Sequence, residues 1–213
     1  MLLLLYVVIY GFYVPLPILD GRMQQTIRNL FFHVPMWFSM MILFTLSVIN
    51  AIRFLKTSQK KYSFYSVAFA AVGLWFGLLG IFTGAVWAKS QWGSAWSGDP
   101  KQNGAAIAIL IYIAYFILRK NVESNDKIHR VAAIYNIFAY CMLFPTIWIL
   151  PRLTESLHPG GEGTEGNPGF NPKDLDNTLR WVFYPAVIGF TLLGIWIAQI
   201  QQKWLLLKSE NYY

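Results

Sequence analysis

Six long apolar runs constrain the fold of this chain more than any other feature of its sequence. A helix needs about 20 apolar residues to cross a bilayer, and the runs approach or reach that length. Hydrophobic residues make up 56% of the 213 residues and charged residues only 13%, and the mean hydropathy is +0.43. These values are far more apolar than those of a soluble domain. We therefore predict an all-α, polytopic membrane protein, a single domain over 1–213 built as a bundle of six transmembrane helices. The predicted spans are 2–19, 34–55, 64–87, 104–118, 131–150 and 181–201.

Basic residues are unevenly distributed over the two ends of the predicted bundle, and this predicts its orientation. One end carries ten Lys and Arg with three Asp and Glu, a net charge of +7, whereas the other carries seven of each, a net charge of zero. Segments rich in Lys and Arg stay in the cytoplasm, so both termini are predicted to lie there. The segments 88–103 and 151–180 then face outward. Because the basic residues occupy short connections between apolar runs, they indicate membrane orientation rather than nucleic acid binding.

A connection at 87–102, W-A-K-S-Q-W-G-S-A-W-S-G-D-P-K-Q, places Trp87, Trp92 and Trp96 within ten residues. Glycine, aspartate and proline residues around the last two tryptophans favour a loop rather than a spanning helix. Two interpretations are open. The indoles could lie in an interfacial belt between lipid and water, or they could form a platform for a planar, mostly apolar ligand with polar edges.

The third apolar run carries a smooth face. Gly73, Gly77, Gly80 and Gly84 lie at offsets 0, 4, 7 and 11, all within about 40° of one direction on a helix. Trp87 continues this face at its outer end. Small residues at this spacing let a second helix approach closely, so the face either packs the bundle or leads a flat ligand toward the tryptophans.

The three histidines fall into two groups. His129 lies in the charged inner segment K-I-H-R, and we predict that it is solvated. His33, in N-L-F-F-H-V-P-M-W, and His158, in T-E-S-L-H-P-G-G, are both predicted at the outer face. Each by itself is typical of an interfacial hydrogen-bonding residue, but together they could offer two axial nitrogens to a haem iron. A structural zinc site is disfavoured because the single cysteine, Cys141, lies inside an apolar run.

Taken together, these segments resemble a known haem-handling family. The segment W-G-S-A-W-S-G-D, with F-F-H-V-P and S-L-H-P on either side in the chain, is similar to the W-G-x-x-W-x-W-D signature of that family. The length, the six spans and the paired outer histidines most resemble its CcmC branch, the haem exporter proteins of cytochrome c maturation. Gly98 stands where the signature has its third tryptophan, so we expect a smaller platform or compensation by Trp87. Because position 98 is predicted to lie in a loop, Gly98→Trp should be tolerated or should raise haem retention.

The resemblance implies that the two outer histidines bind the iron of haem b axially and that the tryptophan segment contacts the haem. It also implies that haem is presented on the periplasmic side of a bacterial inner membrane to the haem chaperone CcmE. The implied complex further holds an ATP-binding subunit CcmA, a permease CcmB and a small membrane subunit CcmD. The chain itself is expected to be non-catalytic, and it has no G-x-x-x-x-G-K-[ST] motif for nucleotide binding. The implied haem-binding residues are His33, His158, Trp87, Trp92, Gly93, Trp96 and Asp99.

Three other functions are open on the sequence. A transporter that moves haem or another solute through the bundle is disfavoured because the interior of the predicted spans holds no charged residue, and ion-coupled transport usually needs one near the midplane. A redox subunit with an intramembrane b-type haem would carry facing histidine pairs within its helices, whereas the two candidates here lie at or beyond helix ends. A ligase that joins haem to apocytochrome shares the tryptophan signature but usually has a larger chain.

Overall fold

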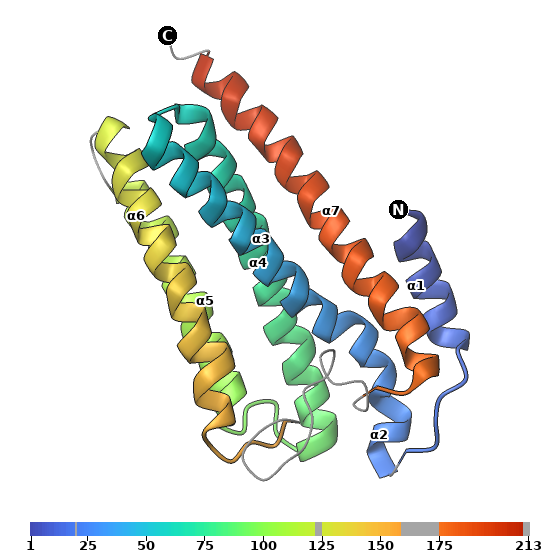
Figure 1. Ribbon diagram of the computed structural model, residues 1–213. Helices are drawn as coiled ribbons and strands as arrows, with labels where there is room; N and C mark the ends of the chain where they lie inside the picture. The colour runs from blue at the N-terminus through green and yellow to red at the C-terminus, as the bar shows by residue number, and fades with distance from the viewer. Residues whose placement is uncertain (20, 122–124, 159–174, 211–213) are drawn as a thin grey trace.

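The computed structural model describes residues 1–19, 21–121, 125–158 and 175–210, and those residues form helices without a strand (Figure 1). The all-α prediction is confirmed. In chain order the elements are α1 (Leu2–Tyr13), α2 (Gly21–Thr26), the 3-10 turn η1 (Ile27–Asn29), α3 (Leu30–Thr57), α4 (Lys60–Trp92), α5 (Pro100–Asn121), α6 (Asn125–Leu143), the π-helical turn η2 (Phe144–Ile149), the 3-10 turn η3 (Leu150–Arg152) and α7 (Asn177–Glu210).

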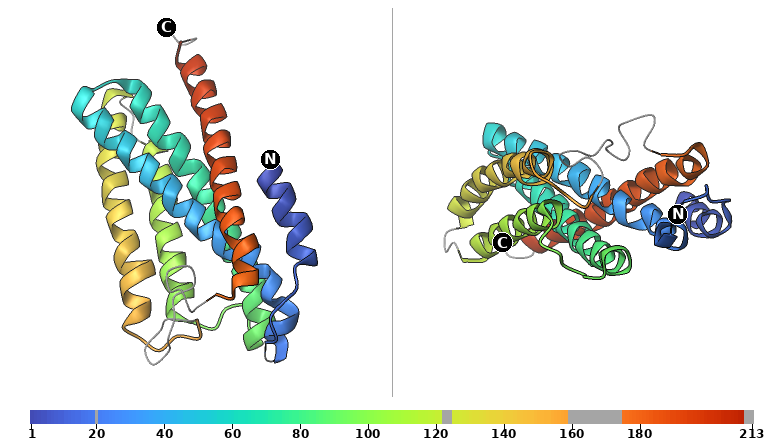
Figure 2. Two further views of the ribbon diagram at one scale, coloured as in Figure 1. Left: turned by 45° about the vertical axis from the view of Figure 1, so that its right-hand side comes forward. Right: turned by 90° about the horizontal axis from the view of Figure 1, so that it is seen from below.

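The antiparallel pair α3 and α4 forms the centre of the bundle, with α5 and α6 on one side and α7 and α1 on the other (Figures 1 and 2). The connections gather at two ends. One end holds the α3–α4 turn, the start of α6 and the end of α7; we call it the basic end, after Lys60, Lys61, Arg119, Lys127 and Lys208. The other end holds α2, the α4–α5 connection and η3, and we call it the tryptophan end, after Trp87, Trp92 and Trp96.

The glycine face of α4 packs directly against its neighbours. A methyl group added at Gly73 would lie 2.8 Å from the ring of Phe44, and one at Gly80 would lie 2.8 Å from the indole of Trp37. At Gly77 the added carbon would collide with Ile109 of α5. Real side-chain carbons do not approach this closely, so these three glycines let α3 and α5 contact the backbone of α4. Of the two interpretations, bundle packing is the one the structure supports here.

The first helix is shorter than predicted. Helix α1 ends at Tyr13 because Val14 is extended and Pro15 and Pro17 follow it, and a residue before proline disfavours helical backbone. Its 12 residues reach about 18 Å, against a bilayer core of about 30 Å. Within the described residues, five helices are long and apolar enough to cross a membrane: 21–57, 60–92, 100–121, 127–152 and 177–209. They cover the other five predicted spans.

The end of α6 brings a distant segment to the start of α5. The hydrogen-bonding pattern loosens into η2 and η3, which contain Pro145 and Pro151, two residues that cannot donate a backbone hydrogen bond. Gly104 of α5 lies against the backbone carbonyl of Thr146, where any side-chain carbon would clash. This close approach places the segment that follows η3 beside the α4–α5 connection.

His129 is buried rather than solvated, so that prediction is wrong. It lies near the start of α6, and only 8% of its surface is exposed. Its Nδ1 lies 2.7 Å from the hydroxyl of Ser63, and its ring meets those of Phe54 and Phe64 at 5.8 and 5.6 Å. The charged neighbours in the sequence gave no sign of this burial, because the residues that cover the ring belong to α3 and α4.

Candidate functional site

His33 lies in the first turns of α3 and points at α4. Its Nδ1 is 3.2 Å from the hydroxyl oxygen of Thr83, and its ring meets the indoles of Trp37 and Trp87 edge-on at 6.2 and 5.9 Å. A methyl group added at Gly84 would lie 2.6 Å from Cε1 of this imidazole. Gly84, the last glycine of the glycine face of α4, therefore makes room for a histidine ring at the tryptophan end.

Trp87 lies within helix α4, in agreement with the predicted span 64–87, and not in the connection that follows the helix. Its indole N–H donates to the hydroxyl of Thr26 at 3.0 Å, and the amide of Gln91 donates to the same oxygen. These bonds tie the last turns of α4 to α2. Because its N–H is already used, Trp87 offers a bound group only its ring.

The tryptophan connection is shorter than the predicted 88–103. Helix α4 continues to Trp92 and ends at Gly93, which has a positive φ of 81° and donates its N–H to the carbonyl of Lys89 at 3.1 Å. Helix α5 begins at Pro100, a residue suited to a first helical position. The connection is thus 93–99, with Trp96 on its surface, 45% exposed.

Gly98 has a φ of 77°, in the left-handed region. The space around it is open, since a methyl group there would meet no atom within 4 Å. A tryptophan would fit sterically but would strain the backbone. We therefore expect the backbone conformation at Gly98 to oppose Gly98→Trp, although the position lies in a connection as predicted.

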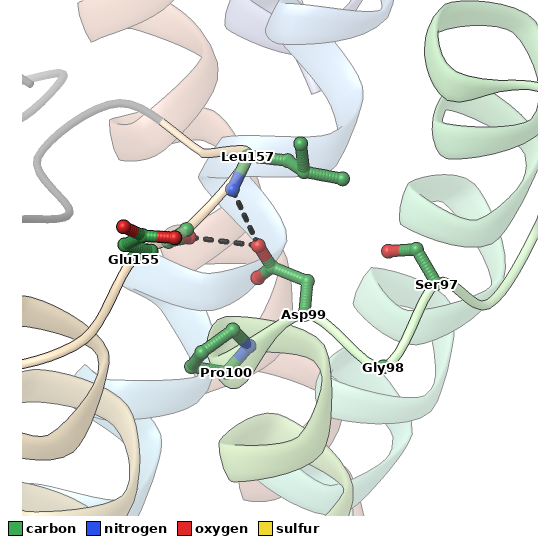
Figure 3. Close-up of a pocket in the computed structure, with 7 residues that line it drawn as sticks. Ser97, Gly98, Asp99, Pro100, Glu155 and Leu157 are labelled. Atoms are coloured by element: carbon green, nitrogen blue, oxygen red, sulfur yellow. Dashed lines mark hydrogen bonds between the residues drawn. The ribbon is translucent and has the colours of Figure 1, made fainter.

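The Asp99 carboxylate joins the connection to the segment that follows η3 (Figure 3). Its Oδ2 accepts the hydroxyl of Ser156 at 2.8 Å and the N–H of Leu157 at 2.7 Å. Its Oδ1 accepts the N–H of Lys101 at 2.9 Å and faces Nδ1 of His158 at 2.8 Å. Burial by itself would raise the pKa of the Asp99 carboxyl, but these donors and the nearby imidazole outweigh it and hold the pKa below its usual value of 3.8.

His158 packs against the last residue of α4. The Trp92 indole meets its ring edge-on, with the ring centres 4.8 Å apart. Burial lowers the pKa of His158 from 6.5, and Asp99 offsets this only in part. The imidazole is therefore neutral at pH 7, the form that can bind a metal.

The end of α4 connects the two outer histidines. Trp87 contacts His33 and Trp92 contacts His158, so both imidazoles pack on the end of this helix. A cleft of about 460 Å³ opens beside Asp99, between 97–100 and 155–157 (Figure 3). Direct contacts gather five of the seven predicted residues into two groups at this end of α4: His33 with Trp87, and His158 with Trp92 and Asp99. Gly93 shapes the turn between them, and Trp96 lies at the surface.

Sequence reasoning missed two polar residues beside the outer histidines, Thr83 and Ser156. Thr83 directly precedes Gly84, the last residue of the glycine face, and Ser156 lies two residues before His158. The position of Thr83 on the histidine-facing side of α4 could have been found from the helical period. Ser156 acts through Asp99, which is 57 residues away in the chain, so no local pattern indicates its role.

Comparison with known proteins identifies the family of the whole chain. A family model described as CcmC, heme exporter protein C, matches residues 1–212. The chain belongs to this family. A CcmC relative, heme exporter protein C of Paracoccus denitrificans (strain Pd 1222), is 23% identical over 195 residues, which cover 92% of this chain and 78% of that protein. Heme exporter protein C of Escherichia coli (strain K12) is 24% identical over 192 residues, covering 90% of this chain and 75% of that protein.

The chain also shares a shorter region with a second group of proteins. Cytochrome c biogenesis protein CcsA of Phalaenopsis aphrodite subsp. formosana is 36% identical over 85 residues, 40% of this chain and 25% of that protein. The likeness to CcsA is therefore regional, whereas the likeness to the CcmC proteins runs through nearly the whole chain.

Proposed function

We propose that this chain binds haem b as a cargo at the tryptophan end of the bundle and presents it for cytochrome c maturation. In this proposal His33 and His158 are the axial ligands of the haem iron. The observation that carries it is the pairing of two imidazoles, 125 residues apart in the chain, around the last turns of one helix. The names of the relatives, heme exporter and cytochrome c biogenesis proteins, agree with it.

The chemistry of the surrounding residues fits haem. Nδ1 of each imidazole has a hydrogen-bond partner, Thr83 for His33 and Asp99 for His158, so Nε2 is the nitrogen that we propose as the iron ligand. The indoles of Trp87 and Trp92 stand beside the two rings and would shield a macrocycle from water. The exposed Trp96 and the turn at Gly93 would complete the contact surface. A redox subunit fits less well, because His33 lies at a helix end and His158 lies in a connection.

The same proposal includes the setting of the site. The ten basic residues at the end away from the tryptophans favour a cytoplasmic basic end and a periplasmic tryptophan end in a bacterial inner membrane. Haem would then be passed to the chaperone CcmE, and CcmA, CcmB and CcmD would complete the complex, with ATP hydrolysis left to CcmA. The chain itself would perform no catalytic step.

An absorption spectrum tests the haem assignment. Protein expressed with haem supplied and then purified should show a Soret band and the visible bands of bis-histidine haem. The double variant His33→Ala, His158→Ala should lose the band because both proposed iron ligands are gone, and haem content is compared per molecule of folded, membrane-inserted protein. Equal haem content in the double variant and the parent would overturn the axial-ligand assignment.

Labelling tests the orientation. In a Cys141→Ser background, Ser94→Cys should react with a membrane-impermeant maleimide from the periplasmic side, and Gln59→Cys only after the membrane is opened. Both positions are exposed, at opposite ends of α4. The reverse pattern would place the tryptophan end in the cytoplasm and contradict presentation in the periplasm.

A further inference from the structure

The hydrogen bonds around His158 determine which of its nitrogens carries the proton. Ser156 accepts the backbone N–H of His158 at 3.1 Å, so its own hydroxyl hydrogen is directed to Asp99. The N–H groups of Lys101 and Leu157 also donate to this carboxylate. With three donors already in place the carboxylate is an acceptor only, and the fourth contact must be a donation from His158 Nδ1. Nε2 is then left with its lone pair.

The same reasoning applies to His33, but with a different partner. The Thr83 hydroxyl has one hydrogen, and it donates this hydrogen to the carbonyl of Leu79 at 2.8 Å. With its hydrogen directed to that carbonyl, the hydroxyl oxygen, 3.2 Å from His33 Nδ1, is placed to accept from the imidazole. Again Nε2 keeps its lone pair, but the acceptor is a neutral oxygen and the hydrogen bond is longer.

Both imidazoles thus offer Nε2, and the two differ in the strength of the bond behind it. A hydrogen bond to an ionised acceptor is about twice as strong as one between neutral groups. Such a bond draws the Nδ1 proton away from the ring and makes the opposite nitrogen a better electron donor to a metal. The carboxylate side of the site is therefore the stronger ligand, and the hydroxyl side the weaker.

We propose that His158 is the retained axial ligand and His33 the exchangeable one, with Asp99 and Thr83 as the positioning residues that set this difference. The inference rests on the proposed haem function. Unequal ligands suit a protein that must release its cargo. A receiving protein can supply its own lone-pair donor on the His33 side, so that the bond from iron to His33 Nε2 breaks as the new one forms. The bond to His158 holds the haem in place during this exchange, and no oxidant or reductant is consumed.

Carbon monoxide provides a probe of the ligand that stays. In haem-loaded protein reduced with dithionite, carbon monoxide should replace the weaker axial ligand, and the Fe–C and C–O stretching frequencies then report the donor strength of the remaining one. Asp99→Asn should shift both frequencies, since it removes the charge behind His158. Thr83→Val should leave them at the parent values, because His33 is no longer bound to the iron.

Haem affinity gives a second readout. Loss of a partner of a metal-bound histidine typically weakens metal binding by about 10- to 100-fold, and we expect Asp99→Asn to fall in that range. Thr83→Val should weaken haem binding by less than about 10-fold, and Thr83→Ser, which keeps the hydroxyl, should restore the parent value. Ser156→Ala loosens the connection but keeps the carboxylate, so it should not shift the carbon monoxide frequencies.

The outcomes separate the two proposals. A parent protein that holds no haem defeats the proposed function itself. A loaded parent whose frequencies respond to Thr83→Val and not to Asp99→Asn, or equally to both or to neither, overturns only the inequality of the ligands. A shift in Ser156→Ala as large as that in Asp99→Asn also overturns it, because loop geometry rather than charge would then explain the effect.

Discussion

His33 and His129 have nearly the same immediate surroundings at opposite ends of the bundle. Each ring lies between α4 and a neighbouring helix, each Nδ1 contacts a hydroxyl of α4, Thr83 for His33 and Ser63 for His129, and each ring meets two aromatic rings edge-on or tilted. His129 has the shorter hydrogen bond, 2.7 against 3.2 Å. Burial and a fixed hydrogen bond therefore do not distinguish the proposed ligand from a core histidine.

The two ends differ in what lies next to each histidine. At the tryptophan end a second imidazole, that of His158, packs on the end of the same helix α4 and is held by a buried carboxylate. At the basic end the neighbours are the phenyl rings of Phe54 and Phe64 and the guanidinium of Arg119, whose two terminal nitrogens lie 3.4 Å from Ser63. The proposal that His33 is an iron ligand therefore depends on the second histidine at that end, because one imidazole cannot bind both axial positions of an iron.

The largest expected effect is the difference in haem affinity between the variants His33→Ala and His129→Ala. His33→Ala should lower haem affinity by at least about 100-fold, since loss of a ligand exceeds the loss of a ligand's partner. His129→Ala should keep the haem content per folded molecule and lower the free energy of unfolding by about 1–3 kcal/mol, because a buried hydrogen bond and ring contacts are lost. Haem titration and thermal unfolding in detergent measure the two effects. Haem loss in His129→Ala, at parent-like stability, would break the comparison.

Gly84 and Gly73 of α4 provide a second test of the role of the His33 ring. Gly84→Ala pushes a carbon against the His33 ring, and Gly73→Ala pushes one against the Phe44 ring. Both should destabilise the bundle by about 1–3 kcal/mol through overpacking. Only Gly84→Ala should also weaken haem binding in protein that remains folded, because it displaces a ligand ring. Equal haem affinity in the two variants would mean that the position of the His33 ring is unimportant.

The two tryptophans after Trp87 give a smaller contrast. Trp92 contacts His158 and is partly buried, whereas Trp96 is 45% exposed in the connection. Trp92→Ala should weaken haem binding by about 1–3 kcal/mol through lost apolar contact and a less confined imidazole. Trp96→Ala should cost less, and in both variants the remaining haem should keep the bis-histidine spectrum. If the double variant Trp92→Ala, Trp96→Ala kept the haem content of the parent, the indoles would be interfacial residues and not haem contacts.

The smallest effect is expected at Gly98. Because its φ is 77°, Gly98→Trp should destabilise the connection by about 1–2 kcal/mol even though the space around it is open. Gly98→Asn, a residue that adopts this conformation more readily, is the matched control and should cost less. Thermal unfolding measures both. A tryptophan variant as stable as the asparagine variant would show that the backbone relaxes at this position.

Local patterns in the sequence were enough to predict the helices. Apolar runs of about 20 residues and a glycine period close to that of a helix depend only on neighbouring residues, and they indicated the bundle and the packing face of α4. Pro15 and Pro17 also carried the signal that shortens α1, although the length of the apolar run concealed it. The candidate residues came from the family resemblance, in which both outer histidines and Asp99 fall at motif positions.

Contacts between distant segments were decided only by the tertiary structure. His129 became a core residue because Phe54, Phe64 and Ser63 close over it, and its charged sequence neighbours carry no information about those residues. Asp99 and His158 meet because Gly104 allows α5 to approach the irregular end of α6. A hydrogen bond joins atoms that lie close in space, whatever their separation in the chain. The period of a helix therefore predicts which face a residue occupies, and the packing of the bundle determines which partner it finds there.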